Sequence, residues 1–220
     1  MAKIAAYSYA HRNTLKGQLL FVFHLIFHPF DGFWDLKHEH RGSRKAATIL
    51  IGLLVVNSII KTQFTGYLYN PYYDGISLNI FNEFATTVGT FLLWCIANWS
   101  LTTLMDGEGS LGDIYVASAY AMAPTVIIGI PLAFLSNIMP NELADVYMLL
   151  NSVAVIWSGG LMLAGTMVVH QYTMTRTVLT AILIVVAMAV MVFLGLLFFN
   201  LISQLVGFVI SVYWEIALRY

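Results

Sequence analysis

Five long apolar runs follow one another along the chain, separated by short polar stretches. They cover residues 46–66, 82–104, 114–136, 146–169 and 178–199. A helix needs about 20 apolar residues to cross a hydrocarbon core of about 30 Å, and each run reaches that length. The pattern predicts an all-α integral membrane protein with five transmembrane helices, which together form a single domain over residues 1–220.

A shorter apolar run precedes these five. Thr14 is suited to cap a helix that continues to Phe27. About 14 residues rise only about 21 Å, so we expect this helix to lie in the membrane interface rather than to span it. Pro29 should end the helix. The next segment is rich in histidine and acidic residues: His28, Asp31, Asp35, His38, Glu39 and His40. We interpret it as a solvated loop, with a metal site as the alternative.

The C-terminal end shows no strong break between residues 178 and 218. One helix of that length would reach about 60 Å, about twice the hydrocarbon thickness. We therefore expect a bend near Asn200 and an amphipathic helix over residues 200–220 on the outer surface, with a sixth span as the alternative. This helix carries a narrow polar stripe, which makes it a candidate for binding a partner protein. The stripe includes Asn200, Gln204, Ser211 and Glu215.

Composition supports this fold class and adds an orientation. Hydrophobic residues make up 60% of the chain and charged residues 10%, against about a quarter charged in soluble domains. Seven of the ten Lys and Arg precede Ala46: Lys3, Arg12, Lys16, Lys37, Arg41, Arg44 and Lys45. The positive-inside rule then predicts a cytoplasmic N-terminus and, with five spans, an outside C-terminus.

Only two charged side chains, Lys61 and Glu83, lie within the runs. Lys61 and Glu83 sit near the same end of two neighbouring spans, so we expect them to contact each other. A pair of side chains reaching the headgroups is one interpretation, and a path for an ion or substrate is the other. Asn57, Asn98 and Asn151 are expected to join helices. No charge lies at the centre of a span, which argues against a proton relay or an ion pump.

Two spans carry helix-modifying residues. Pro124 and Pro131 lie two turns apart on one face of the third span, where they predict a fixed kink or, alternatively, a gating hinge. Gly160 and Ala164 belong to a small-residue face of the fourth span that is suited to close helix packing.

The stretch Met105–Asp113 is the most polar part of the central region, with three carboxylates and three glycines. We expect a tight cytoplasmic turn that offers a contact surface, formed by Asp106, Gly107, Glu108, Gly109 and Asp113. The spacing does not follow a calcium loop. The chain also contains no GxSxG, HExxH, Walker A or CxxC pattern, so we predict no enzymatic activity, cofactor, metal or nucleic-acid partner.

Two segments carry a family resemblance. Asp106–Tyr115 (DGEGSLGDIY), followed by Ala119–Pro124 (AYAMAP), resembles the central signature of the Yip (Ypt-interacting protein) domain family in its bacterial branch. His28–Lys37 is similar to the same branch, and the likeness runs from about residue 28 to residue 215. The resemblance implies a five-span protein of a bacterial inner membrane with its N-terminus in the cytoplasm.

The eukaryotic and bacterial members of this family imply different functions for the chain. Eukaryotic members are trafficking proteins linked to Rab GTPases through an N-terminal region whose motif this chain does not show, so we do not extend GTPase binding to it. Some bacterial relatives look like companions of solute-transport systems. Our primary hypothesis is a non-enzymatic accessory or scaffold subunit, in contact with membrane lipid and with another membrane protein such as the permeases of an ABC-type carbohydrate importer. The alternatives are a small channel or transporter acting alone, and a membrane-shaping or trafficking-type protein.

Overall fold

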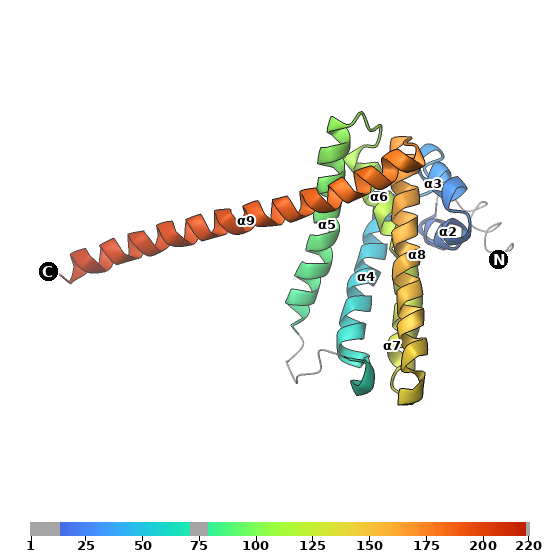
Figure 1. Cartoon of the computed structure of the whole chain (residues 1–220), viewed down its shortest axis with the longest axis horizontal. Helices are drawn as coiled ribbons and strands as arrows, with labels where there is room; N and C mark the ends of the chain where they lie inside the picture. Colours follow the sequence, from blue (N-terminus) through green and yellow to red (C-terminus); the bar gives the residue numbers. More distant parts are fainter. Residues whose placement is uncertain (1–13, 71–78, 219–220) are drawn as a thin grey trace.

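The structure, a computed structural model, describes residues 14–70 and 79–218. A bundle is formed by α4 (Arg44–Phe64), α5 (Ile80–Leu104), α6 (Leu111–Ala121), α7 (Ala123–Leu135) and α8 (Ala144–His170) (Figure 1). With α6 and α7 stacked as one rod, and with the last helix of the chain, five helical segments are long and apolar enough to cross a membrane. The predicted all-α class with five spans is confirmed.

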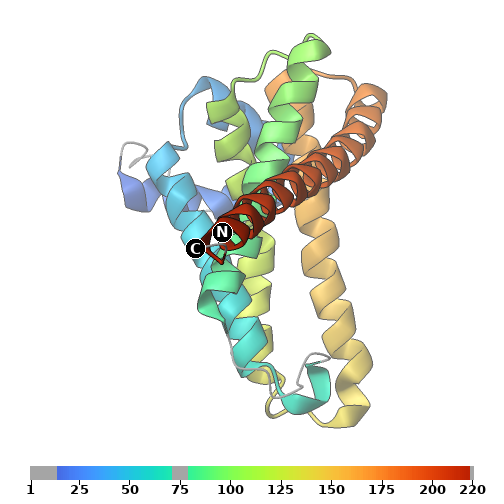
Figure 2. The same cartoon turned by 90° about the vertical axis from the view of Figure 1, so that its left-hand side faces the viewer.

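The bundle has two ends that differ in what they carry. The connections over residues 105–110 and 171–173 lie beside α3 (Pro29–His38), and we call this the α3 end. The short helices η1 (Tyr67–Tyr69) and η2 (Asn141–Leu143) lie at the opposite end, which we call the η2 end (Figure 2). The four bundle spans α4, α5, α6–α7 and α8 therefore run in alternating directions, as the alternating polar connections predict.

The N-terminal segment is more helical than expected. The helix α2 (Leu15–Phe27) begins where predicted, since Thr14 Oγ1 accepts a hydrogen bond from the Gly17 N–H at 3.2 Å. The predicted loop after it is wrong over residues 29–38, where α3 forms. Pro29 ends α2 but also starts α3, because proline is favoured at the first helical position. Phe33 is fully buried on α3 and packs on Gly165 of α8, which fixes this helix to the bundle.

The third span is broken rather than continuous. The predicted run 114–136 corresponds to α6 and α7, which meet at Met122. Pro124 has no N–H to donate to the preceding turn, and next to it Thr125 Oγ1 donates to the Met122 carbonyl at 2.6 Å. Pro131 lies inside α7 without interrupting it. The two prolines thus act differently, and the break lies immediately before the first.

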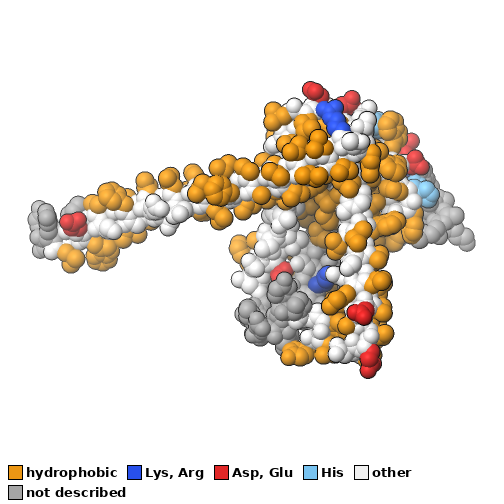
Figure 3. Space-filling model, viewed as in Figure 1, with side chains coloured by type: hydrophobic (Ala, Val, Ile, Leu, Met, Phe, Trp, Pro, Cys, Tyr) orange, Lys and Arg blue, Asp and Glu red, His pale blue; other side chains and the backbone are white. Residues whose placement is uncertain are grey.

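Two buried clusters hold the bundle together. The larger lies towards the α3 end and joins α2, α3, α4, α6 and α8 through side chains such as Phe21, Leu25, Leu50, Ile114 and Tyr120. The smaller lies at the η2 end around Tyr69, Leu132, Met139 and Tyr147. Large apolar side chains also cover the exposed sides of the helices (Figure 3). An apolar exterior of this kind is what a lipid environment requires.

The last helix, α9 (Met174–Ala217), is one continuous helix of 44 residues. The predicted bend near Asn200, and a separate helix over 200–220, are therefore wrong. No proline lies in this stretch, and single glycines such as Gly195 and Gly207 weaken a helix by about 1 kcal/mol without ending it. In both views α9 starts at the α3 end and passes across α5 (Figures 1 and 2), and Figure 1 shows it extending away from the bundle.

Only the base of α9 is buried. Thr177, Thr180 and Ile184 are 0% exposed where the helix lies on α5 and α8. From Leu196 to Leu218, every side chain that the structure describes is exposed. The projecting half of α9 therefore has no partner among the described residues of this chain.

Candidate contact site at the α3 end

The polar loop between α5 and α6 begins with a compact helix C-terminus. Asp106 adopts the left-handed conformation with φ 54°, and the Gly107 N–H donates to the Thr102 carbonyl at 2.8 Å. This is the hydrogen bond of a Schellman motif, in which the chain turns sharply back over the last turn of the helix. Aspartate tolerates the left-handed region better than most residues. The predicted tight turn is present and starts at Asp106.

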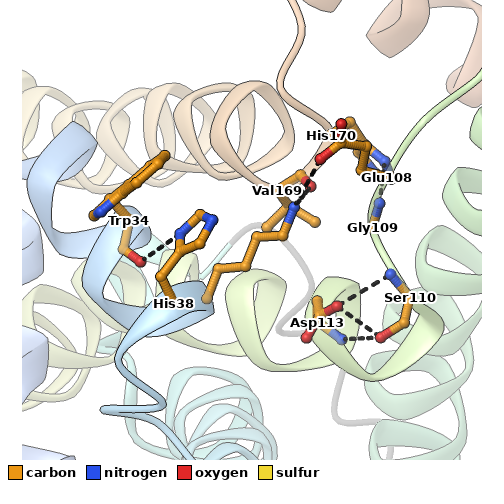
Figure 4. Close-up of polar contacts among 9 residues, drawn as sticks. Trp34, His38, Glu108, Gly109, Ser110, Asp113, Val169 and His170 are labelled. Carbon is orange, nitrogen blue, oxygen red and sulfur yellow. Dashed lines mark hydrogen bonds and ion pairs between the residues drawn. The ribbon is translucent and has the colours of Figure 1, made fainter.

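Both glycines of the loop lie against the C-terminus of α8. A methyl group on Gly107 would lie 2.6 Å from His170 Nδ1 and 2.8 Å from the Tyr172 hydroxyl oxygen. A methyl group on Gly109 would lie 2.5 Å from Val169 Cγ1. The Gly109 N–H donates to His170 Nδ1 at 3.3 Å (Figure 4). The glycines are thus needed for close approach between two connections that are far apart in the sequence.

Asp113 has a structural role at the start of α6. Its carboxylate accepts hydrogen bonds from the Ser110 N–H at 3.1 Å and from Ser110 Oγ at 2.7 Å (Figure 4). Ser110 Oγ in turn accepts from the Asp113 N–H at 3.3 Å. This reciprocal capping box satisfies N–H groups that have no partner within the helix. Of the predicted contact residues, Asp113 is therefore engaged locally, whereas Asp106 and Glu108 are exposed.

Lys37 ties α3 to the same place. Its Nζ donates to the Val169 carbonyl at 2.8 Å and lies 3.8 Å from a carboxylate oxygen of Glu108 (Figure 4). A cation on a terminal carbonyl is favourable at the negative end of a helix, and α8 ends one residue later, at His170. Glu108 is 59% exposed, so its ion pair with Lys37 contributes less than the buried hydrogen bond.

The start of α9 is attached to the loop through one carbonyl group. The Met105 carbonyl accepts from the Tyr172 hydroxyl at 3.0 Å and from the Arg176 guanidinium. Arg176 also lies over the Tyr172 ring, 4.4 Å from its centre. Burial raises the pKa of the Tyr172 phenol, with the charge of Arg176 acting in the opposite direction. The hydroxyl therefore stays protonated and remains a donor at neutral pH.

A small polar cavity lies beneath the loop. His170 Nε2 and Asn98 Oδ1 are both buried and have no hydrogen-bond partner among the described residues. Both residues line a cavity of about 10 Å³. Because His170 Nδ1 accepts from Gly109, we assign the ring proton to Nε2, so the cavity is lined by one residue with an unused donor and one with an unused acceptor. The space is about that of one water molecule, which would satisfy both groups.

Lys61 and Glu83 are not paired with each other in the described chain. Lys61 Nζ donates to Asn151 Oδ1 at 2.7 Å, on α8. Glu83 accepts from Ser58 Oγ at 2.5 Å and from Thr62 Oγ1 at 3.2 Å. Ser58 and Thr62 are four residues apart and share one face of α4, whereas Lys61 points about 60–100° away from them. The predicted Lys61–Glu83 contact is therefore wrong.

A second, larger cavity of about 630 Å³ opens between α4, α5 and α7, within the apolar spans. Its wall is rich in hydroxyl groups and includes Lys61, Thr62, Thr86, Thr87, Thr90 and Thr125. Most of the surface of the wall is apolar, and the hydroxyl groups of Thr62 and Thr86 donate to backbone carbonyls one turn earlier, which makes them tolerable at membrane depth. The sequence shows the threonines, but only the fold brings those of three helices to one cavity.

The remaining predicted positions are dispersed. Ala164 is buried in the larger core cluster, whereas Gly160 is exposed and has no atom within 4 Å of a Cβ built on it. Asn57 is buried against Gly129 of α7. On α9, Gln204 Nε2 donates to Asn200 Oδ1 at 3.1 Å, far from the loop. The loop, the prolines and the α9 stripe thus form three separate regions.

Comparison with known proteins gives one match. The family model described as the Yip1 domain matches residues 23–197, from α2 to the middle of α9, and includes the whole loop site. No curated protein and no solved structure matches the chain. The match covers well over half of the 220 residues, and the helices are those of a membrane protein. This chain therefore belongs to the Yip1 domain family and is an integral membrane protein.

Proposed function

We propose that this chain is a non-enzymatic accessory or scaffold subunit that binds another integral membrane protein through α9. The observation that carries this proposal is the projecting half of α9, in which every described side chain from Leu196 to Leu218 is exposed. A helix of 44 residues is about 66 Å long, about twice the hydrocarbon thickness. Such a helix has much more apolar surface than its own bundle covers.

The polar stripe on this half favours a protein partner over lipid alone. Asn200 and Gln204 hydrogen-bond to each other, and Ser211 Oγ donates back to the Gly207 carbonyl at 2.9 Å. The amide groups keep further donors and acceptors that lipid tails cannot satisfy. Membrane helices use such amide and hydroxyl side chains to join one another. Glu215 continues the same face towards the C-terminus.

We further propose an orientation and a partner class. Lys37, Arg41, Arg44, Lys45 and Arg176 all belong to the α3 end, which supports a cytoplasmic position for that end. The C-terminus of α9 would then lie outside, in a bacterial inner membrane. The partner we put forward is the permease pair of an ABC-type solute importer, a suggestion that rests on the family resemblance.

Co-purification from mild detergent tests the proposal. A variant with Asn200→Leu and Gln204→Leu keeps the helix apolar but removes the amide stripe, and should lose the co-purifying membrane protein. The matched control is Ile202→Ala with Val206→Ala, on the opposite face of the same turns, which should retain it. Recovery of no stoichiometric membrane protein with the unmodified chain would refute the proposal.

The cavity of about 630 Å³ favours a second candidate function, a small transporter or channel acting alone. Its hydroxyl-lined wall and Lys61 offer hydrogen bonds to a polar solute at membrane depth. The helix would bend at the break between α6 and α7 at Met122. Pro124 and Pro131 follow that break, both within α7. Purified protein in liposomes distinguishes the candidates. Solute flux that depends on this chain alone and is lost in Lys61→Met supports transport.

A further inference from the structure

The α3 end contains a further cavity, which differs from the two already described because several charged side chains line it. It measures about 240 Å³ and lies between α3, the start of α4 and the start of α6. Its polar wall carries Lys37, His40, Arg44 and Asp113. Two permanent cations and a histidine thus face one space, together with one carboxylate.

Arg44 is available for a ligand. It is exposed at the first position of α4, and its guanidinium makes no ion pair or hydrogen bond with any residue in 14–70 or 79–218. It extends along the first turn of α6, where a methyl group on Gly112 would lie 2.7 Å from Arg44 Nη2. His40 is exposed as well, with φ 51° at the end of the α3 connection.

The carboxylate in the wall does not cancel these charges. Asp113 accepts both hydrogen bonds from Ser110 through Oδ2, at the positive end of α6, and its single negative charge is outnumbered by the two cations Lys37 and Arg44. Lys37 donates to the Val169 carbonyl and lies 3.8 Å from a carboxylate oxygen of Glu108, which is 59% exposed and outside the wall; an ammonium group has three donors, so a further bond remains. The cavity therefore favours an anion.

An apolar groove continues from this cavity. It measures about 540 Å³ and lies between α4, α5 and α6, with Leu92, Ile96, Leu111 and Tyr115 in its wall. Arg44 and Gly112 line both spaces, so the cationic cavity and the groove meet at Arg44. Arg44 and Leu111 are each the first residue of an apolar span. The end of a span lies at the depth of the lipid headgroups.

We propose that these two joined spaces form a binding site for an anionic glycerophospholipid. The phosphate lies against Arg44, His40 and Lys37, and one acyl chain follows the groove past Ile96. Arginine matches phosphate oxygens with paired N–H donors, and basic pockets between helix ends are known to hold anionic headgroups. This site is independent of the partner surface on α9, so either proposal can fail alone.

Native mass spectrometry of the purified full chain tests the site. The probes are phosphatidylglycerol, phosphatidylcholine of the same chain length, and glycerol 3-phosphate. We expect phosphatidylglycerol to bind about tenfold more tightly than phosphatidylcholine. Arg44→Gln should weaken phosphatidylglycerol binding about tenfold, so that the two lipids bind about equally. Lys45→Gln is the matched control, since Lys45 is an exposed neighbouring base outside both cavities, and it should bind normally.

A second pair of variants separates a lipid from a free phosphate compound. Ile96→Trp fills the groove and should weaken phosphatidylglycerol binding, whereas Leu53→Trp on the exposed side of α4 should not. If Arg44→Gln does not fold, His40→Asn tests the same cavity and suits the left-handed backbone there. Equal binding of the two lipids overturns the proposal. The proposal is also overturned if glycerol 3-phosphate binds as tightly as phosphatidylglycerol and if Ile96→Trp leaves that binding unchanged.

Discussion

Replacement of Gly107 by alanine tests whether the loop is held by close approach to α8. The added methyl group would lie within 3.0 Å of three atoms, at 2.6 Å from His170 Nδ1, 2.8 Å from the Tyr172 hydroxyl and 2.9 Å from Thr102 Cβ. His170 and Thr102 are each 1% exposed, so neither can move away freely. Overpacking of this kind costs about 1–3 kcal/mol.

The substitution should also disturb the hydrogen bonds that the displaced groups make. Moving the His170 ring weakens its bond from Gly109, and moving Tyr172 weakens its bond to the Met105 carbonyl. Each neutral hydrogen bond contributes about 1 kcal/mol. We therefore expect Gly107→Ala to lower the free energy of unfolding by about 2–4 kcal/mol.

Equilibrium unfolding in mixed micelles, with denaturing detergent as the titrant, measures this change. Gly89→Ala is the matched control, because Gly89 is exposed on α5 with no atom within 4 Å of a Cβ built on it. That control should be neutral or more stable by up to about 1 kcal/mol, since alanine favours helix. If Gly107→Ala proves as stable as Gly89→Ala, the close approach of the two connections is not what holds the loop.

Three further predictions use the same unfolding measurement. Lys37→Met should cost about 1–3 kcal/mol because it uncovers a buried carbonyl, whereas Glu108→Gln should cost less than about 1 kcal/mol because that ion pair is exposed. Asp106→Ala should cost about 1 kcal/mol more than Asp106→Asn, since φ is 54° there and asparagine tolerates it. Burial lowers the pKa of His24 below 6.5, so its contribution to stability is complete above pH 6.5 and declines as the pH falls below it; His24→Gln should flatten that decline.

The spans could be predicted because their signal is local. The run 46–66 corresponds to α4 at Arg44–Phe64, and the run 82–104 to α5 at Ile80–Leu104, since apolar length alone identifies a membrane helix. The C-terminal helix was predicted wrongly for a related reason. Membrane thickness limits the length of a helix only where the helix runs parallel to the other spans, whereas α9 contains no residue that ends it and passes across them.

The loop site was only partly predictable. Its glycines and Asp113 suggested a capped turn, and the turn is there. Lys37 and Val169 lie 132 positions apart, and Gly109 and His170 lie 61 apart, so no local pattern joins them. Their contact depends on which helix ends the bundle brings together. The same holds for Lys61, whose partner depends on the rotation of α4 about its axis rather than on its depth.

The attachment of α9 makes it a long lever with a short base. Its first turns are fixed by Arg176 to Met105 and by the buried Thr177 and Thr180, while the far half is held by no other described residue. The projecting half, from Leu196 onward, is about 33 Å long, so a rotation of one degree where it leaves the bundle moves the tip by roughly 0.6 Å. A rotation of about five degrees at that point therefore moves the tip, next to Glu215, by roughly 3 Å. In the reverse direction, a load on the tip reaches the loop at Met105 together with the contacts that α9 makes on α5 and α8.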